Sequence, residues 1–325
     1  MVTLKDLAKE LNVSVSTVSK ALSDSHEISE KTKEKTLELA KKRNYIPNNT
    51  AVNLRRKSTR TIGVIIPNIF NHFYTKILSG IESEAKKNNY KTIVSISNET
   101  LLSEKEGLDF FSNGSVDGVL LAPSDETEKL NEVEHFFELK RKGIPFVLFD
   151  RYIDNLNVDK VIVNDLESSR NVIQYFLDDG RQNILVVSLL KNLKIGDLRK
   201  QGALLDDTID LLEHDEEIGF EIELREKIEN KKIDAIFALD ELSGIIALNL
   251  IRQKQIDIPK EVAIISFSQG ILSKYSYPKL SIVNQYAKEI GAKSVELLLE
   301  RLKDNDKPVE TKMIKTSLEF NQTTL

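Results

Sequence analysis

The chain has 325 residues, of which 30% are charged, and its formal net charge is −5. It has no cysteine, which excludes a disulfide framework and thiolate metal sites, and its four histidines lack metal-ligand spacing, so we expect no metal. No catalytic motif, no apolar run of about 18 residues and no secretory signal occurs, so we expect a cytoplasmic protein that is not an enzyme and has no cofactor or membrane partner.

Residues 3–22 predict two short helices joined by a tight turn. Thr3 is placed to cap the first helix, and Asp6 stands three residues later as its capping-box partner. Asn12 interrupts the apolar spacing, and Ser14 offers a cap for the second helix. The apolar positions at helical spacing are Leu4, Leu7, Ala8 and Leu11, followed by Val15, Val18, Ala21 and Leu22.

The outward side of the second helix carries short hydrogen-bonding groups and one cation. These residues are Ser16, Thr17, Ser19 and Lys20, and such groups suit phosphates and base edges better than a protein core. A helix-turn-helix that inserts its second helix in the DNA major groove has this form. The alternative is a helical hairpin that packs against the rest of the chain.

A third helix is expected from Glu30 to Asn44. Ser29 can cap its start, and Pro47 follows closely and prevents the helix from continuing. The residues expected on its buried side include Thr36, Leu37 and Ala40.

The two ends of the chain differ in the sign of their charge. Residues 1–60 carry 13 Lys and Arg against 7 Asp and Glu, a net of +6, so residues 61–325 account for −11 of the total of −5. A basic head gains free energy by releasing the counterions of a nucleic acid, whereas an acidic body is repelled by it. This segregation argues against the alternative that the basic residues form an ordinary solvated surface.

By its pattern, the segment 48–60 is a polar linker with one exposed leucine, Leu54. A helix at residues 49–56 would have barely two turns, and a helix of that length is marginal in water by itself. A plain tether is the alternative interpretation.

The remaining residues predict two α/β lobes. Short strands that are apolar on both faces alternate with amphipathic helices, which is typical of doubly wound parallel sheets covered on both sides. In such folds ligands bind at the carboxyl ends of the strands. The expected strands are 62–66, 92–96, 118–122 and 146–150, then 184–187, 235–239 and 262–267, and the expected helices include 74–89, 127–142, 168–177 and 241–255.

The chain resembles the lactose-repressor (LacI/GalR) family of bacterial transcription regulators. The resemblance covers essentially the whole chain. The motifs that carry it are VTLKDLA at residues 2–8, VSVSTVSK at 13–20, NYIPN at 44–48, AVNLR at 51–55 and TRTIGV at 59–64.

The resemblance implies three parts. Residues 1–47 would be the helix-turn-helix headpiece, and residues 48–60 a hinge helix that folds on DNA. Residues 61–325 would be a periplasmic-binding-protein-like body for effector binding and dimerisation, with two doubly wound parallel sheets. Its first lobe is expected at about 61–160 and 286–317 and its second at about 161–285 and 318–325. Three crossovers would join the lobes near residues 158–164, 284–285 and 316–320.

The implied partner is a pseudo-palindromic double-stranded DNA operator, bound by a homodimer. In the headpiece the implied contacts are Thr3, Leu4, Ser14, Val15, Ser16, Thr17, Ser19 and Lys20, with Val15, Ser16 and Lys20 on bases. In the hinge, Leu54 would wedge between base pairs and kink the duplex, with Ala51 as the close-approach residue and Arg55 a minor-groove contact. Val52 departs from the family, since many relatives carry a basic residue there.

The resemblance also implies that a small, carbohydrate-related effector binds between the lobes and controls operator affinity. A guanidinium such as that of Arg199 suits a carboxylate, a phosphate or a pair of sugar hydroxyls. The residues expected at this site are Asn68, Phe73, Tyr74, Ser124, Asp150, Arg151, Arg199, Asp240 and Ser268.

Three departures weaken the effector prediction. Ser268 stands where relatives usually carry an aspartate, Leu193 and Ile195 replace a stretch that is often polar, and the segment 202–234 is short. Each hydrogen-bonding group left unmatched costs about 1–3 kcal/mol, so a typical sugar would bind poorly. The alternative is a DNA-binding regulator that is independent of effectors or controlled by a partner protein, with a degenerate cleft.

Overall fold

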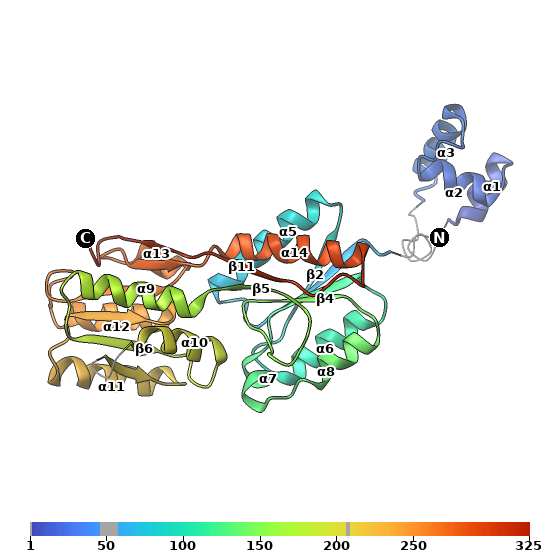
Figure 1. Ribbon diagram of the computed structural model, residues 1–325. Coiled ribbons are helices and arrows are strands. Elements are labelled where there is room, and N and C mark those ends of the chain that lie inside the picture. Colours follow the sequence, from blue (N-terminus) through green and yellow to red (C-terminus); the bar gives the residue numbers. More distant parts are fainter. Residues whose placement is uncertain (1, 46–57, 206–208) are drawn as a thin grey trace. The chain divides into compact units, whose positions relative to one another are not determined.

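The computed structural model describes residues 2–45, 58–205 and 209–325. The chain divides into two compact units, one ending at Thr59 and the other running from Arg60 to Leu325 (Figure 1). We call them the headpiece and the body. None of the helices in the described ranges is both long enough and apolar enough to cross a membrane.

The headpiece has three helices whose starts are capped as the sequence predicts. They are α1 (Leu4–Leu11), α2 (Val15–Leu22) and α3 (Glu30–Lys42). The side chains of Thr3, Ser14 and Ser29 accept hydrogen bonds from backbone N–H groups of the first turns, and Asp6 completes the capping box of α1. Asn12 ends α1 in the left-handed conformation, as expected from the break in apolar spacing.

The buried side of α3 differs from the prediction at Leu37, which is 46% exposed. The helix instead buries Lys33, Thr36 and Ala40, which are three and four residues apart and therefore lie on one face. Lys33 can be buried because its ammonium pairs with Asp24 and Glu30. The expectation for Thr36 and Ala40 is confirmed and that for Leu37 is wrong.

The body contains two six-stranded sheets, and parallel pairing predominates in both, as the sequence predicts. In the first sheet the order is β11 (Thr311–Ile314), β5 (Asp159–Val163), β4 (Phe146–Phe149), β3 (Gly118–Leu121), β1 (Thr61–Ile66) and β2 (Lys91–Ile96). In the second it is β12 (Ser317–Glu319), β10 (Ser281–Asn284), β9 (Ala263–Phe267), β8 (Ala235–Ala238), β6 (Ile184–Ser188) and β7 (Asp210–Glu213). Only β12 pairs antiparallel among these strands, against β10.

Helices cover both faces of each sheet (Figure 1). The helices of the first lobe are α5 (His72–Lys87), α6 (Leu101–Ser112), α7 (Asp125–Leu130), α8 (Glu134–Arg141) and α14 (Ala287–Lys303). Those of the second lobe are α9 (Asp165–Asp178), α10 (Lys194–Ala203), α11 (Glu217–Asn230), α12 (Glu241–Gln253) and α13 (Ile271–Tyr275).

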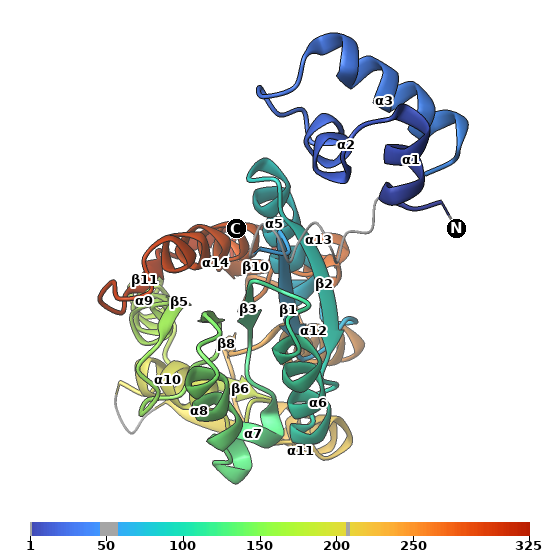
Figure 2. The same ribbon diagram turned by 90° about the vertical axis from the view of Figure 1, so that its right-hand side faces the viewer.

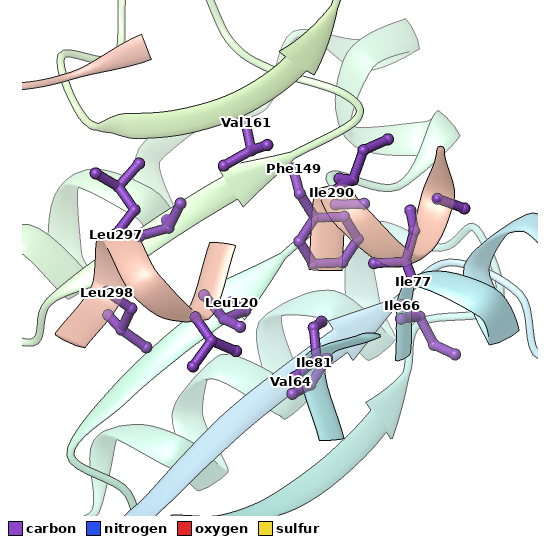
Figure 3. Packing of buried hydrophobic residues seen from close by; sticks show 14 of the residues in the cluster. Val64, Ile66, Ile77, Ile81, Leu120, Phe149, Val161, Ile290, Leu297 and Leu298 are labelled. Atoms are coloured by element: carbon purple, nitrogen blue, oxygen red, sulfur yellow. The ribbon is translucent and has the colours of Figure 1, made fainter. Parts of the chain in front are cut away.

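Strand β1 shows how one sheet supports two cores. Val64 and Ile66 pack with Ile77 of α5 and Ile290 of α14 (Figure 3), whereas Ile65, on the opposite face, packs with residues of α6 and α8. This alternation follows from the two-residue period of side chains along a strand, and it explains why the strand is apolar throughout.

Helices α5 and α14 are far apart in the sequence but lie side by side in the body (Figure 2). Glycines allow their backbones to approach closely. A Cβ atom added at Gly80 would lie 2.1 Å from the carbonyl oxygen of Lys288, and one added at Gly291 would lie 2.1 Å from that of Ile77. The hand and distance of this contact are therefore set by residues without side chains.

One predicted helix of the body is wrong. The segment 127–142 forms two helices, α7 and α8, instead of one. Asn131 takes the left-handed conformation at φ 52° and ends α7, so the chain turns before α8 begins at Glu134. The amphipathic spacing continues across this turn, which is why the sequence suggests one helix.

The chain passes between the two sheets three times. It leaves the first sheet after β5, returns to the first lobe between β10 and α14, and crosses again between β11 and β12. These connections bring the carboxyl ends of strands from both sheets to the region between the lobes, where parallel α/β folds bind their ligands.

Candidate functional site

The exposed face of α2 is one candidate site. Its first turn is organised by Ser14, whose hydroxyl accepts from the backbone N–H of Thr17 at 3.1 Å and lies 2.7 Å from the Ser16 hydroxyl. Val15 is 40% exposed, whereas Val18 and Ala21 are buried against the other helices. The helix thus presents one apolar and several hydroxyl groups outward while its opposite face anchors it.

The cation of this face is held by an acidic residue. The ammonium group of Lys20 forms an ion pair with the carboxylate of Glu27, in the segment that connects α2 to α3. Both side chains are partly exposed, so water screens the pair and its contribution to stability is small. Ser19 and Thr17 are half-buried beside it.

The other predicted DNA contacts have varied positions. Thr3 is exposed and caps α1, and Leu4 packs partly against the headpiece core. Ala51, Leu54 and Arg55 lie outside the described residues.

The second candidate site is a cavity of about 90 Å³ between the two lobes of the body. Its lining includes the ends of β4, β8, β9 and β10 and the start of α5. The residues around it are Asn71, Phe73, Tyr74, Asp150, Arg151, Leu190, Ile195, Arg199, Asp240, Glu241, Phe267, Ser268, Gln269 and Gln285.

Seven of the nine predicted effector residues lie around this cavity: Phe73, Tyr74, Asp150, Arg151, Arg199, Asp240 and Ser268. The other two have local structural roles. Asn68 accepts a hydrogen bond from the backbone of Phe70, and Ser124 is fully buried where it caps α7. Asn68 and Ser124 are therefore not among the residues that line this cavity.

Arg199, on α10, is 4% exposed and already has two acceptors. Its Nε donates to the carboxylate of Asp165 at 2.7 Å, and its Nη1 donates to the carbonyl oxygen of Leu239 at 2.7 Å. The guanidinium also lies over the ring of Phe267, with 3.9 Å between its carbon and the ring centre.

Arg151, directly after β4, is held in the same way by the first lobe. Its guanidinium donates to the two carboxylate oxygens of Glu99 at 2.8 and 3.1 Å and pairs with Asp125 at 2.6 Å. It also donates to the carbonyl oxygen of Pro123. Such bidentate pairs fix the orientation of the guanidinium plane.

Asp150 is buried beside these charges. Its Oδ2 accepts a hydrogen bond from the hydroxyl of Tyr74 at 2.9 Å. Burial raises the pKa of Asp150 to about 6, although Arg151 and Arg199 oppose this shift. Burial also raises the pKa of Tyr74, so its phenol stays protonated and donates. Asp150 has the left-handed φ of 64°, which is uncommon for a residue with a side chain.

Two further acidic groups line the second lobe's side of the cavity. Asp240 caps α12, accepting from the backbone N–H groups of Ser243 at 2.9 Å and Leu189 at 2.8 Å. Glu241, the next residue, accepts from the hydroxyl of Ser268 at 2.7 Å and from the backbone N–H of Ser273 at 3.1 Å.

Sequence reasoning missed four polar residues of the cavity: Asn71, Glu241, Gln269 and Gln285. Glu241 and Gln285 follow the carboxyl ends of β8 and β10, so their position in the strand pattern could have revealed them. Among the described residues, no group of three or more histidine or acidic side chains is placed to hold a metal ion.

A capped helix-turn-helix joined to a two-lobed α/β body with a cavity between its lobes is the arrangement of a DNA-binding protein with a candidate ligand site. Residues 3–48 match the model of bacterial regulatory proteins of the lacI family, and residues 173–324 match a periplasmic binding protein-like domain. The chain thus combines a DNA-binding domain of the lacI family with a periplasmic-binding-protein-like domain, as in DNA-binding transcription regulators, which confirms the predicted resemblance and fold class.

Individual relatives agree with this assignment. The chain is 28% identical over 318 residues to the HTH-type transcriptional repressor PurR of Aliivibrio fischeri, covering 94% of this chain and 93% of the relative. It superimposes on the lac repressor dimer bound to operator and the anti-inducer ONPF with a TM-score of 0.86 at 20% identity, covering 100% and 99% of the two chains. The regulator CelR in its cellobiose complex gives a TM-score of 0.70 at 21% identity, with 99% and 100% covered.

Proposed function

We propose that this protein is a homodimeric repressor that binds a pseudo-palindromic operator and that a small, carbohydrate-related effector in the interlobe cavity controls its DNA affinity. It acts on chromosomal DNA, and thus in the bacterial cytoplasm, as a regulator and not as an enzyme. The observation that carries the proposal is the anchored α2 with its outward Val15, Ser16 and Lys20, in a headpiece of the lacI family.

The DNA side rests on the chemistry of α2. Its N-terminal turn can enter the major groove, where the Val15 methyl groups suit a thymine methyl and the Ser16 hydroxyl suits a base edge or phosphate. Lys20 lies one to two turns further along the helix. It can reach a phosphate or a guanine once its ion pair with Glu27 is broken. Thr17 and Ser19 would contact the DNA backbone, with Thr3, Leu4 and Ser14 at the start of each helix beside them.

The hinge side rests on the family membership. Ala51, Leu54 and Arg55 would form the minor-groove contact, with Leu54 as the wedge between base pairs.

The effector side rests on the cavity and on the cellobiose bound by the related regulator CelR. A ligand can shift operator affinity only by binding the two lobe arrangements with different affinity.

A Lys20→Ala variant tests the DNA assignment. We expect specific operator affinity, measured by fluorescence anisotropy at several KCl concentrations, to fall, and the slope of log affinity against log salt to decrease by about one. Glu27→Gln should act in the opposite direction, because it frees the ammonium and removes a negative charge near the phosphates.

Glu38→Gln, an exposed change on α3, is the matched control for Glu27→Gln. Unchanged affinity and slope in Lys20→Ala would contradict the placement of α2 in the groove. Absence of salt-sensitive binding to any duplex by the wild-type protein would contradict the proposed function as a whole.

A further inference from the structure

Both guanidinium groups that line the cavity are already paired with carboxylates. Arg199 is neutralised by Asp165, and Arg151 by Glu99 and Asp125, at 2.6–2.8 Å. The ammonium of Lys76, which adjoins the cavity, donates to the carbonyl oxygen of Gln269. An anion bound beside these arginines would be repelled by the carboxylates that already pair with them.

Carboxylates, in contrast, remain available to a ligand. Asp150 uses Oδ2 for Tyr74, and Glu241 uses Oε1 for Ser268 and Ser273, while no hydrogen bond to the second oxygen of either group occurs within the described part of the chain. A carboxylate can accept up to about four hydrogen bonds, so both groups have unused capacity.

Ser268 stands where an aspartate is expected, and Glu241 supplies the acidic acceptor in its place. Ser268 donates its hydroxyl hydrogen bond to Glu241, so the carboxylate reaches the cavity from α12 instead of from the end of β9. Gly270 makes room for it, because a Cβ atom at that position would lie 1.7 Å from Oε2 of Glu241. The three residues form a unit that holds a carboxylate at the cavity wall.

The charges around the cavity sum to a negative value. The carboxyl groups are Asp150, Asp240 and Glu241 in the wall and Glu99, Asp125 and Asp165 behind the arginines, against the cations Arg151, Arg199 and Lys76. A cation entering this site gains Coulomb energy and an anion loses it, and both effects are larger in a buried site than in water.

One neutral side chain at the cavity, that of Gln285, has a hydrogen-bond donor without an acceptor. Gln285 is 5% exposed, lines the cavity, and its amide nitrogen has no hydrogen-bond partner. A buried donor without an acceptor is unfavourable, so a ligand oxygen that accepts from it would be favoured. At about 90 Å³, the cavity is smaller than the roughly 150 Å³ that holds a benzene-sized ligand, so a sugar ring would require the lobes to part.

We infer that the effector is a small hydroxylated amine, an amino polyol or amino sugar, whose ammonium group binds Glu241 and Asp150 and whose hydroxyl accepts from Gln285. This inference rests on the proposed function, because it names the ligand class of the same cavity. The aromatic rings of Phe73, Tyr74 and Phe267 add apolar walls.

Two matched series of probes test the inference by isothermal titration calorimetry on the full-length protein. One compares glucosamine, glucose and glucuronate, and the other compares 2-amino-1,3-propanediol, glycerol and glycerate. We expect the amine of at least one series to bind at least tenfold more tightly than its neutral and anionic counterparts. The same amine should change the affinity for operator DNA.

Glu241→Gln should reduce the preference for the amine to about threefold or less. This variant keeps an acceptor for Ser273 and the same shape, so its melting temperature should stay close to that of the wild type. Asp150→Asn provides a second variant with the same expected loss of preference. Glu226→Gln, an exposed change on α11, is the matched control and should bind the amine normally.

Tighter binding of a neutral or anionic probe, equal binding within a series, or no binding of either amine at millimolar concentration would overturn the inference. So would an unchanged amine preference in folded Glu241→Gln. Operator binding without ligand separates the two conclusions: if it persists while the amines fail, only the ligand class is wrong, and if it is absent, the proposed function is wrong.

Discussion

Asp150 and Arg199 illustrate how burial determines the behaviour of single charged residues in this protein. Both lie at the cavity wall with less than a tenth of their surface exposed. Asp150 has an incompletely compensated carboxyl group, whereas Arg199 is paired with the carboxylate of Asp165 and also donates to the carbonyl oxygen of Leu239. Removal of the Asp150 charge should therefore stabilise the body, whereas removal of the Arg199 charge should destabilise it. Two substitutions measure these effects.

Asp150→Asn should stabilise the body at high pH. The pKa of Asp150 in the folded protein is about 6, above its usual 3.8, so folding favours the protonated form. The stability associated with this group is present below pH 3.8 and is lost as pH rises through 6. A shift of this size corresponds to about 3 kcal/mol, so the variant should exceed the wild type by up to that amount at pH 8 and by little at pH 4.5.

The groups that face Asp150 are Tyr74 from α5, Arg151 after β4, Asp165 from α9 and Arg199 from α10. Urea denaturation at the two pH values measures the difference, with the exposed Glu106→Gln as control. An equal stability difference at both pH values would show that burial does not raise the pKa of this carboxyl group.

Arg199→Ala should destabilise the body by about 3–5 kcal/mol, because it leaves the buried carboxylate of Asp165 without a partner. The double variant Asp165→Asn with Arg199→Met removes both charges and should recover most of the lost stability. Urea denaturation compares the three proteins, and a single variant as stable as the wild type would contradict the structural role of the pair.

At the scale of elements, the contact between α5 and α14 organises the first lobe. The two helices cover one face of the sheet and share the apolar cluster of β1, β3 and β4 (Figure 3). The start of α5 also carries Phe73 and Tyr74 into the cavity. A change in the helix contact therefore affects both the core and the site.

Gly80→Ala should destabilise the first lobe by about 1–3 kcal/mol, because the added methyl group would meet the backbone of Lys288 at 2.1 Å and backbone cannot rotate away. Ser83→Ala, on the exposed side of the same helix, should have little effect. Thermal denaturation compares the two, and similar melting temperatures for both variants would show that the helices can move apart without cost.

At the scale of the whole molecule, the chain joins a basic N-terminal part to an acidic C-terminal part. Residues 1–60 carry a net charge of +6, which favours contact with DNA, and residues 61–325 carry −11, which opposes it. The segment between the headpiece helices and the body contains Leu54, for which we propose a hinge role.

Leu54→Ala should weaken specific operator binding by roughly tenfold or more, because an apolar wedge stabilises the kinked duplex. The melting temperature of the body should remain unchanged, since Leu54 precedes it in the sequence. Anisotropy and calorimetry on the same preparation measure the two quantities. A parallel decrease in both would assign Leu54 to the body and not to the hinge.

The sequence by itself predicted the capped headpiece helices, the α/β class of the body and most strands, because these follow from local spacing and capping chemistry. It also identified seven residues around the cavity, since strand ends in parallel folds meet at one edge. It failed at Leu37 and at the turn near Asn131, where several helix faces or lengths fit the same pattern.

Only the tertiary structure decided how the charges of the cavity are shared. Arg199 and Asp165, or Arg151 and Glu99, are separated by tens of residues, and no local pattern encodes which partners meet. Glu241 provides a carboxylate beside Ser268, which has none. This arrangement likewise depends on the packing of α12 against the end of β9. Pairing of buried charges is a property of the folded lobes, because it arises only when distant strand ends and helices come together.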